Sequence, residues 1–545
     1  MEKSMRFFNN AGPIKKDMNY YIEPLSRWDL DEVLGLISQE RYFVLHAPRQ
    51  TGKTSCLLSL RDYLNEEGKY LAVYCNIEIA QACLHDVKRS AKAIVGEIKE
   101  RLFRITKDEK LHSGIAEVYK GKEADKGISA VLTYICENVD KPVVFIFDEI
   151  DALIGDTLIS VLRQIRGGYD KRPESFPSSV ILCGVRDVRD CRITSSTNEI
   201  VTGGSAFNIK AKSLTLGNFS KEDVINLYTQ HTTETGQIFE EDCYDLIMDY
   251  TDGQPWLVNA LAHEVIHEMK ENRDPAVTIT PKMLEVAKER LILERQTHLD
   301  QLTDKLKEDR VRRIILPMIL GEGELHSDDD ISYCIDLGII KKGSKGLQIS
   351  NAIYKEIIPR VLTYGTQTYF ESKYQKETLW LNEDGSINVK ALLTLFKDFW
   401  NKNAGIQGSH IAEYREATPQ LILQAFLQRV ANGNGYVNRE YGLSRYRTDI
   451  MVEWHYKING VLTIQNIVME LKVLRKNDKY QTIRDEAIEQ TLNYTKSCGE
   501  DKAHILIFDR DNKQGWGADE VNEIVEVDGV VMEIWKLWQE REEEV

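Results

Sequence analysis

Residues 42–54, YFVLHAPRQTGKT, constrain the fold more than any other stretch of the chain. The apolar residues 42–45 predict a strand buried on both faces, and the residues after Thr54, SCLLSLRDYL, have helical spacing. A strand, a tight loop ending in Gly-Lys-Thr and a helix form a phosphate-binding loop, because backbone N–H groups of the loop and the helix N-terminus point at anionic phosphates. The stretch therefore predicts an α/β domain that binds a nucleotide.

Two side chains of this loop have distinct expected roles. Lys53 would reach the β- and γ-phosphates as a point charge, and the Thr54 hydroxyl would ligate Mg²⁺. Ala47 stands where the pattern has its first glycine, and we favour the phosphate loop over a plain glycine turn because the flanking structure fits. The residues predicted to bind ATP here are Ala47, Arg49, Gln50, Thr51, Gly52, Lys53, Thr54 and Ser55.

A second nucleotide signature lies in residues 143–151, VVFIFDEID. Asp148, at the end of this apolar strand, would hold Mg²⁺ through water or Thr54. Glu149 would orient and deprotonate the attacking water. We favour this interpretation over two solvated acids after a core strand, because the pair follows a phosphate-binding loop.

A further buried strand is predicted at residues 179–186, SVILCGVR. ATPases with these two motifs place a polar sensor of the γ-phosphate at the end of such a strand, so Arg186 is a candidate, with Asp187 beside it. One of three arginines before the strand could act as an arginine finger on a neighbouring subunit. A surface salt bridge is the favoured interpretation for each of these three, Arg163, Arg166 and Arg172.

In residues 250–266, YTDGQPWLVNALAHEVI, the Gly253-Gln254-Pro255 sequence ends one helix and starts another. Together with the phosphate-binding loop and the DEID strand, this segment resembles the AAA+-related ATPases of the signal-transducing STAND and archaeal-ATPase kind, over about residues 1–290. The resemblance implies a nucleotide-gated conformational switch in which Pro255 couples the nucleotide to a helical lid.

Residues 305–362 have the element order of a winged helix: helix, helix, short strand, glycine turn, strand and helix. A winged helix can read DNA, but residues 328–330, three consecutive aspartates, stand where a recognition helix needs basic side chains. We therefore favour an intramolecular module that relays the switch over a DNA reader. The aromatic and polar stretch that follows, residues 366–405, predicts adaptor helices.

The composition bounds the class of protein. The chain has 545 residues, of which 42% are apolar and 29% charged, as is typical of soluble multidomain proteins. Its net charge of −16 argues against a wholly basic surface but leaves room for a local nucleic-acid groove. Nine cysteines without a CxxC pair favour a reducing compartment. Because no apolar leader and no run of 18 apolar residues occurs, we expect a cytoplasmic protein that does not span a membrane.

Residues 413–508 contain a second group of candidate residues. Asp449 follows alternating polar and apolar positions, as at the end of a strand, and Glu470 and Lys472 alternate on the next strand, so both face one side. Two hard carboxylates, Asp449 and Glu470, suit Mg²⁺, which would polarise a phosphodiester and activate water. Lys472 would stabilise the developing charge.

This pattern of Asp449 followed by Glu470-Leu471-Lys472, within a helix–strand–strand–helix–strand order, resembles the PD-(D/E)XK nuclease fold. The resemblance implies that Asp449 and Glu470 are metal ligands and that Lys472 is the catalytic lysine. The alternative is a structural α/β domain whose Glu470–Lys472 pair is a surface salt bridge.

Three further positions bear on the resemblance. Glu416, on the first helix of this region, would be an additional acid. Gln490, with Tyr494 beyond it, matches a glutamine that many members of the superfamily carry. Thr448 stands where the family name has its proline, a variation that is common in the superfamily.

Local charge favours a nucleic-acid site over the structural alternative. Residues 429–484 carry 10 Lys and Arg against 5 Asp and Glu, a net charge of about +5 within a chain of −16. Basic charge with aromatic side chains is what a nucleic-acid backbone with its bases favours. The tyrosines interleaved with these arginines are Tyr436, Tyr441, Tyr446 and Tyr456.

Nearly the full length resembles a bacterial architecture, an AAA-ATPase-like protein with a C-terminal PD-(D/E)XK nuclease. We expect a multidomain α/β protein with five parts. These are a P-loop ATPase core at 1–214, a helical lid with Gly-x-Pro at 215–300, a winged helix at 301–365, adaptor helices at 366–405, and a restriction-endonuclease-like PD-(D/E)XK α/β domain at 406–545.

The expected function is a switch that binds and hydrolyses ATP and controls a Mg²⁺-dependent nuclease, for which DNA is the favoured substrate and RNA the alternative. Defence against phage or foreign DNA is the natural guess for such a fusion. The alternative is a regulatory ATPase that binds DNA or a partner protein through its winged helix and a catalytically inactive nuclease fold. We expect a homo-oligomer, because a nuclease that cuts both strands needs two copies, and leave open a trigger or partner protein.

Overall fold

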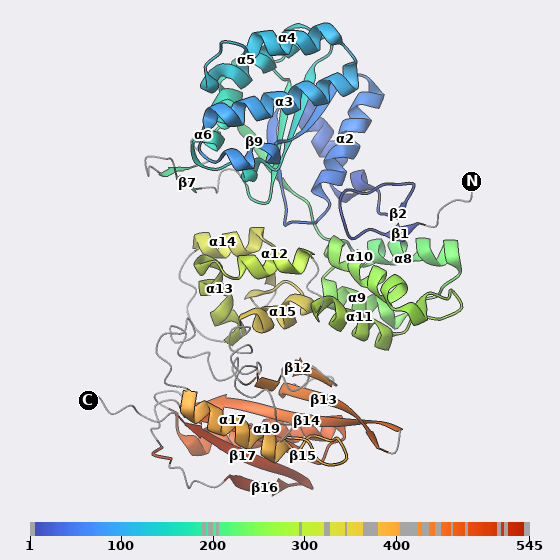
Figure 1. The fold of residues 1–545 in the computed structure, drawn as a ribbon, viewed down its shortest axis with the longest axis vertical. Helices are drawn as coiled ribbons and strands as arrows, with labels where there is room; N and C mark the ends of the chain where they lie inside the picture. The colour runs from blue at the N-terminus through green and yellow to red at the C-terminus, as the bar shows by residue number, and fades with distance from the viewer. Residues whose placement is uncertain are drawn as a thin grey trace. The chain divides into compact units, whose positions relative to one another are not determined.

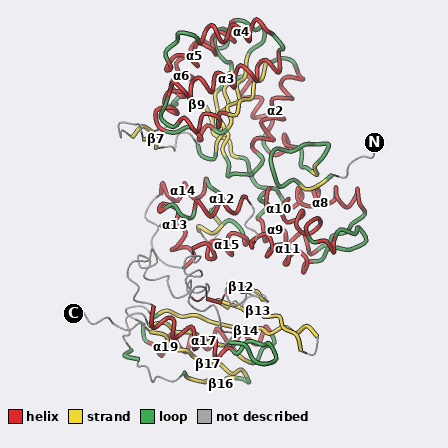
Figure 2. The backbone as a smooth tube through the Cα atoms, viewed as in Figure 1, coloured by secondary structure: helices red, strands yellow, loops and turns green. Residues whose placement is uncertain are grey.

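The computed structural model describes residues 6–187, 192–194, 200–202, 207–293, 297–320, 328–343, 346–362, 380–403, 423, 426–427, 435–441, 448–458, 461–474, 478–509, 514–516 and 522–538. It divides into two compact units, residues 1–314 with 325–355, and residues 315–324 with 356–545. Within the described residues, each unit contains one large sheet, which Figure 2 shows with its surrounding helices.

The first unit is built on a parallel sheet. Every residue of its strands β5 and β6 is buried, as expected for a sheet covered on both faces. Strand β3, which leads to the phosphate-binding loop, does not neighbour β5, because β6 lies between them. The predicted α/β fold is confirmed, and the pairing of all five strands is parallel. The strand order is β4 (Leu71–Asn76), β5 (Val143–Asp148), β6 (Ser179–Gly184), β3 (Tyr42–His46) and β9 (Lys210–Thr215).

Helices cover both faces of this sheet (Figure 1). On one face, Leu57, Leu60 and Leu64 recur at helical spacing along α2 and are fully buried against the strands. That face carries α1 (Leu30–Ser38) and α2 (Lys53–Glu67), and the other carries α3 (Val87–Thr106), α4 (Glu109–Tyr119), α5 (Ala124–Glu137) and α6 (Gly155–Gly167). A short antiparallel hairpin, β7 (Arg192–Thr194) and β8 (Ile200–Thr202), precedes β9.

A helical segment follows the sheet. Ser220 starts it with a capping box, in which its hydroxyl accepts from Asp223 N and the Asp223 carboxylate accepts from Ser220 N. The N-terminal strands β1 (Phe7–Phe8) and β2 (Asn19–Tyr20) pack on this segment, with Phe8 and Tyr228 ring centroids 5.2 Å apart. Its helices are α8 (Lys221–Thr235), α9 (Asp242–Thr251), α10 (Pro255–His263) and α11 (Pro281–Leu293).

The next elements have the order predicted for residues 305–362. Their two strands pair as an antiparallel hairpin. The three aspartates begin α14, where negative charge stabilises the helix N-terminus. The elements are α12 (Thr297–Lys305), α13 (Asp309–Leu320), α14 (Asp328–Asp336), β10 (Ile340–Gly343), β11 (Gly346–Ile349) and α15 (Ala352–Leu362).

The second unit contains a mixed sheet with helices on both faces. Helix α17 (Val389–Asn403) buries Leu392, Phe396 and Trp400 against one face, and α19 (Tyr480–Cys498) buries Tyr494 against the other. The strand order is β12 (Gly435–Tyr441), β13 (Thr448–Ile458), β14 (Val461–Val473), β15 (Lys502–Asp509), β17 (Val530–Trp538) and β16 (Glu523–Val527).

Helix α17 packs into the core of the second unit. It falls within residues 366–405, for which we expected adaptor helices, yet its apolar face is part of the core of the six-stranded sheet. Its amphipathic pattern indicated a buried face but not the surface that buries it. None of the described helices is both long and apolar enough to cross a membrane.

Candidate functional site

The phosphate-binding loop has the backbone that its sequence requires. Gly52 has a φ of 90° and stands directly before α2, so a residue free to adopt a left-handed backbone starts the helix. The Lys53 ammonium is buried and donates to the backbone oxygens of Ala47, at 2.8 Å, and Pro48, at 2.9 Å. The lysine is therefore held inside the curve of the loop by two carbonyl groups, which phosphate oxygens can replace.

Thr54 and Asp148 meet at the end of this loop. The Thr54 hydroxyl donates to Asp148 Oδ2 at 2.8 Å, and the Tyr74 hydroxyl donates to the same oxygen at 2.8 Å. The Glu149 N–H donates to Asp148 Oδ1 at 3.0 Å, and the Asp148 side chain is fully buried. The two residues predicted to hold Mg²⁺ thus present hard oxygen ligands side by side, a donor set that fits this ion.

Glu149 lies beside that pair in an unusual backbone conformation, with a φ of 58°. Such a conformation costs a non-glycine residue free energy and is common at functional sites. Burial raises the pKa of the Glu149 carboxyl and the nearby carboxylates of Asp148 and Asp151 raise it further, whereas Lys53 and Arg49 lower it. A raised pKa brings the carboxylate closer to the range in which a general base works near neutral pH.

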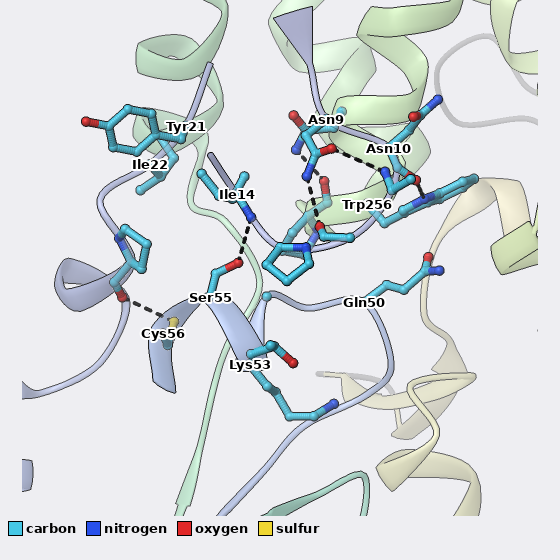
Figure 3. A pocket seen from close by; sticks show the side chains of 18 of the residues that line it. Asn9, Asn10, Ile14, Tyr21, Ile22, Gln50, Lys53, Ser55, Cys56 and Trp256 are labelled. Atoms are coloured by element: carbon cyan, nitrogen blue, oxygen red, sulfur yellow. Dashed lines mark hydrogen bonds between the residues drawn. The ribbon is translucent and has the colours of Figure 1, made fainter. Parts of the chain in front are cut away.

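A cavity of about 290 Å³ opens beside the loop, and the N-terminal segment 9–14 forms part of its wall. Ile14 N donates to Ser55 Oγ at 3.1 Å, and Trp256 Nε1 donates to Asn10 O at 2.7 Å, as Figure 3 shows. Of the predicted site residues, those that line the cavity are Arg49, Gln50, Gly52, Lys53, Thr54, Ser55, Glu149 and Pro255. Ala47, Thr51, Asp148 and Arg186 are not among its lining residues.

Arg27 is a cavity residue that carried no signal in the sequence. Its guanidinium donates to Thr51 O and Gly217 O and lies over the Phe219 ring, 4.7 Å from the centroid. It therefore joins the phosphate-binding loop to the segment that leads into α8. Burial lowers the pKa of Arg27.

The Gly253-Gln254-Pro255 sequence touches the loop through its glutamine. Gln254 Oε1 caps α10 by accepting from Leu257 N at 2.6 Å, and its amide lies 3.5 Å from the backbone oxygens of Arg49 and Gln50. Pro255 occupies the first turn of α10, where its missing N–H costs nothing. A Cβ on Gly253 would lie 2.0 Å from Phe219 O, so only glycine fits there.

Arg186 points to the α14–β10 segment, defined as residues 328–343. Its Nε lies 3.3 Å from Asp336 Oδ2, its Nη2 3.9 Å from Asp329 Oδ1, and its guanidinium 5.0 Å from the Tyr333 centroid. Asp187, the second sensor candidate, pairs with Lys210. The structure thus places the Arg186 side chain in an ion pair within the first unit.

The same segment contacts the phosphate-binding loop and the residue that precedes Gly253. A Cβ on Gly338 would lie 2.7 Å from Pro48 Cγ in the phosphate-binding loop, so the turn after α14 packs closely on that loop. Lys341 pairs with Asp252, directly before Gly253. The α14 acids are also paired within the chain, since Arg310 bonds Asp329 and Asp330.

One of the arginine-finger candidates, Arg172, binds residues of its own chain. Arg172 Nε donates to Tyr169 O at 2.6 Å, a second nitrogen donates to Glu40 O, and the guanidinium stacks 3.4 Å from the Tyr169 centroid. Arg163 lines a shallow surface groove between α5 and α6.

In the second unit, three predicted residues come together on the face covered by α19. Lys472 Nζ donates to Glu470 Oε1 at 2.8 Å and to Gln490 Oε1 at 2.6 Å, and Glu470 is 5% exposed. Asp449 is in β13 directly before Ile450, whose backbone partner is Met469, the residue before Glu470.

Two candidate residues of this site, one of them only by its side chain, lie outside the described part of the chain. Glu416 falls outside the described residues, as does the side chain of Asp449. Among the side chains that the structure describes, no three His, Cys, Asp or Glu residues form a group arranged to hold a metal ion.

The parallel sheet, the phosphate-binding loop and the Thr54–Asp148 pair define a nucleotide-binding domain of the P-loop ATPase class. A family model described as an AAA-like domain matches residues 9–356, and the chain belongs to that family. The first unit is accordingly ATPase-like.

Solved structures include similar chains, all at low identity. A Walker-type ATPase of Pyrococcus abyssi is 14% identical over 64% of this chain and 99% of that chain, with a TM-score of 0.41. Cdc6p of Pyrobaculum aerophilum is 16% identical over 62% and 92%, with a TM-score of 0.34. ORC2 of Aeropyrum pernix is 13% identical over 65% and 97%, with a TM-score of 0.33. A comparison with curated proteins gives no significant match. The family match, rather than these similarities, carries the assignment.

Proposed function

We propose that this chain is an ATP-driven switch that controls a Mg²⁺-dependent nuclease acting on DNA. The observation that carries the nuclease part is the contact of Lys472 with both Glu470 and Gln490 on one face of the second sheet. The switch part is carried by the contacts of the α14–β10 segment with Arg186, with Pro48 of the phosphate-binding loop and with Asp252.

ATP would bind with its phosphates in the loop and its base toward the segment 9–14. Lys53 would exchange its two carbonyl partners for phosphate oxygens. Thr54 and Asp148 would hold Mg²⁺, which when bound neutralises charge on the β- and γ-phosphates. Glu149 would take the proton of the attacking water, a role that its raised pKa favours.

Nucleotide state would act on the α14–β10 segment through Arg186. In the proposal this segment is part of a winged helix, and helices α8–α11 form the lid. The γ-phosphate would compete with Asp336 for Arg186, while ATP in the loop would alter the packing of Pro48 on Gly338. A ligand shifts a conformational equilibrium only when it binds one of the two conformations more tightly. ATP would bind more tightly to the conformation in which Arg186 is released from Asp336.

In the second unit, Asp449 and Glu470 would hold a Mg²⁺ ion, which when bound polarises the phosphodiester. Carboxylate oxygens fit this ion, and continuation of the β13–β14 register sets position 449 opposite position 470. Lys472 would stabilise the developing negative charge, and Gln490 would hold the lysine in place. The net charge of about +5 over residues 429–484 favours a nucleic-acid substrate.

The second candidate is a regulatory ATPase with an inactive nuclease fold that serves as a binding module. The Glu470–Lys472 ion pair at 2.8 Å is compatible with it, because such a pair is also a common structural contact. DNA reading by α14 is disfavoured, since its acids already pair with Arg186 and Arg310. A homo-oligomer, a cytoplasmic location, an activating partner and a role in defence against foreign DNA belong to the first proposal.

Cleavage of plasmid and single-stranded DNA in Mg²⁺ tests the nuclease part. We expect wild type and Glu526→Gln, which changes an exposed glutamate of the same sheet, to cut equally. Glu470→Gln should lose at least about a hundredfold in rate while its ATP hydrolysis stays unchanged. Equal cutting by Glu470→Gln and Glu526→Gln would remove the nuclease assignment.

A further inference from the structure

Within the described part of the chain, the Asp148 carboxylate accepts hydrogen bonds from two hydroxyl groups and one backbone N–H. Its Oδ2 accepts from the Thr54 and Tyr74 hydroxyls, each at 2.8 Å, and its Oδ1 accepts from the Glu149 N–H at 3.0 Å. The side chain is fully buried, so these donors help to set its orientation, and the buried Cys183 side chain lies beside it.

Of these donors, Tyr74 is independent of the nucleotide. Thr54 belongs to the phosphate-binding loop and is itself a proposed metal ligand, and the backbone of Glu149 lies in a strained left-handed conformation. Tyr74 comes from the middle of β4, where its backbone partner on β5 is Ile146. Its ring is 4% exposed and packs in the core between the sheet and α2, so the hydroxyl has little freedom to move.

We propose that Tyr74 is a positioning residue for the Mg²⁺–nucleotide site. Its hydroxyl holds Asp148 Oδ2 in place, and so keeps the carboxylate turned toward the Thr54 side of the site, whether or not Thr54 has itself turned toward a nucleotide. Hydrogen-bond partners of metal-ligating carboxylates set ligand orientation, and their loss costs about 10- to 100-fold in metal affinity or activity. The proposal rests on the Mg²⁺–ATP site proposed above.

The sheet offers a matched control. The Tyr42 hydroxyl donates to Pro177 O at 2.8 Å, and Tyr42 begins β3, at the end of the sheet away from the phosphate-binding loop. Tyr42→Phe and Tyr74→Phe therefore each remove from the same sheet one hydrogen bond that a buried tyrosine hydroxyl donates, and the two hydrogen bonds have the same length. A purely structural role would give the two variants the same behaviour.

The test is the affinity of the full-length protein for a fluorescent ATP analogue, measured in EDTA and across a Mg²⁺ titration. For Tyr74→Phe we expect unchanged affinity in EDTA and about a tenfold higher half-saturating Mg²⁺ concentration. Tyr42→Phe should match wild type in both.

If the half-saturating Mg²⁺ concentration of Tyr74→Phe lies within twofold of the wild-type value, the positioning role is wrong, whereas the proposed ATP site is unaffected. Binding by wild type that does not depend on Mg²⁺ would overturn the metal site and the positioning role together. An equal rise of the half-saturating Mg²⁺ concentration in Tyr42→Phe and Tyr74→Phe would also overturn the positioning role, because the effect would then follow from lost stability of the sheet.

Discussion

Arg186, two residues after the end of β6, forms an ion pair with Asp336 at the end of α14, with 3.3 Å between Nε and Oδ2. Both side chains are mostly buried, at 13% and 14% exposure. The strand that ends before Arg186 stands between the strands of the phosphate-binding loop and of Asp148. The pair therefore connects the centre of the nucleotide-binding sheet to the α14–β10 segment.

If the γ-phosphate and Asp336 compete for Arg186, Asp336→Asn should raise the affinity for ATP relative to ADP. We expect a shift of about 5- to 10-fold, within the usual range of coupling free energies. Asp328→Asn, which changes the exposed first residue of α14, is the control and should leave the ratio unchanged. Fluorescent nucleotide titrations give the dissociation constants for ATP and ADP, and their ratio is compared between the variants. Equal ratios in Asp336→Asn and Asp328→Asn would show that Asp336 does not compete with the γ-phosphate.

Glu149→Gln should separate binding from hydrolysis. The amide keeps the size and the buried position of the side chain but cannot accept the proton of water. We expect ATP affinity within about threefold of wild type and a fall in the hydrolysis rate of about 10²- to 10⁴-fold. Single-turnover hydrolysis with saturating protein measures the chemical step, and a rate near that of wild type would exclude Glu149 as the base.

The pH dependence of ATP hydrolysis should report the ionisation of Glu149. Glu149 acts as a base only when it is ionised, and burial beside Asp148 and Asp151 raises its pKa above the ordinary glutamate value of 4.5. Activity should therefore fall as the pH is lowered, with the midpoint of this acid limb above pH 4.5. The profile of kcat/KM for ATP gives the midpoint, and a midpoint at or below 4.5 would contradict the assignment.

Gly253→Ala should destabilise the first unit more than Gly236→Ala. Both glycines have a positive φ, 69° and 84°, so alanine costs about 1–2 kcal/mol at either position. A Cβ meets nothing within 4 Å at Gly236 but would lie 2.0 Å from Phe219 O at Gly253. We expect at least about 2 kcal/mol of additional destabilisation there, from overpacking against backbone, measured by urea unfolding. Similar unfolding midpoints for the two variants would show that the Gly253 turn can relax.

The sequence identified those parts of the nucleotide site whose chemistry is local in the chain. Residues 47–55 and the pair Asp148 and Glu149 follow apolar strands, and the apolar pattern that predicted buried strands was sufficient to bring the two motifs to one sheet edge. The hydrogen bond from Thr54 to Asp148 agrees with that inference.

Other residues come to the site only because distant segments of the chain pair or pack together, and the sequence carried no signal for them. Tyr74 is an ordinary aromatic residue of a core strand, and only the pairing of β4 with β5 makes it a partner of Asp148. Arg27 and the segment 9–14 are not part of any motif and come to the cavity from the N-terminal lead-in. Arg186 was expected near the γ-phosphate, and its pairing with Asp336, far along the chain, depends on how α14 packs.

The central claim, that ATP controls a nuclease, is tested most directly by DNA cleavage in Mg²⁺ with and without ATP. The assay compares wild type with Lys53→Ala, which loses the loop ammonium, and with Glu470→Gln. The account predicts that ATP changes the wild-type cleavage rate at least about tenfold, the free-energy scale of a typical coupled switch. It predicts one rate with and without ATP for Lys53→Ala, and a rate at least about a hundredfold lower than that of wild type for Glu470→Gln. A wild-type rate that is the same with and without ATP, or a Glu470→Gln rate close to that of wild type, would contradict it.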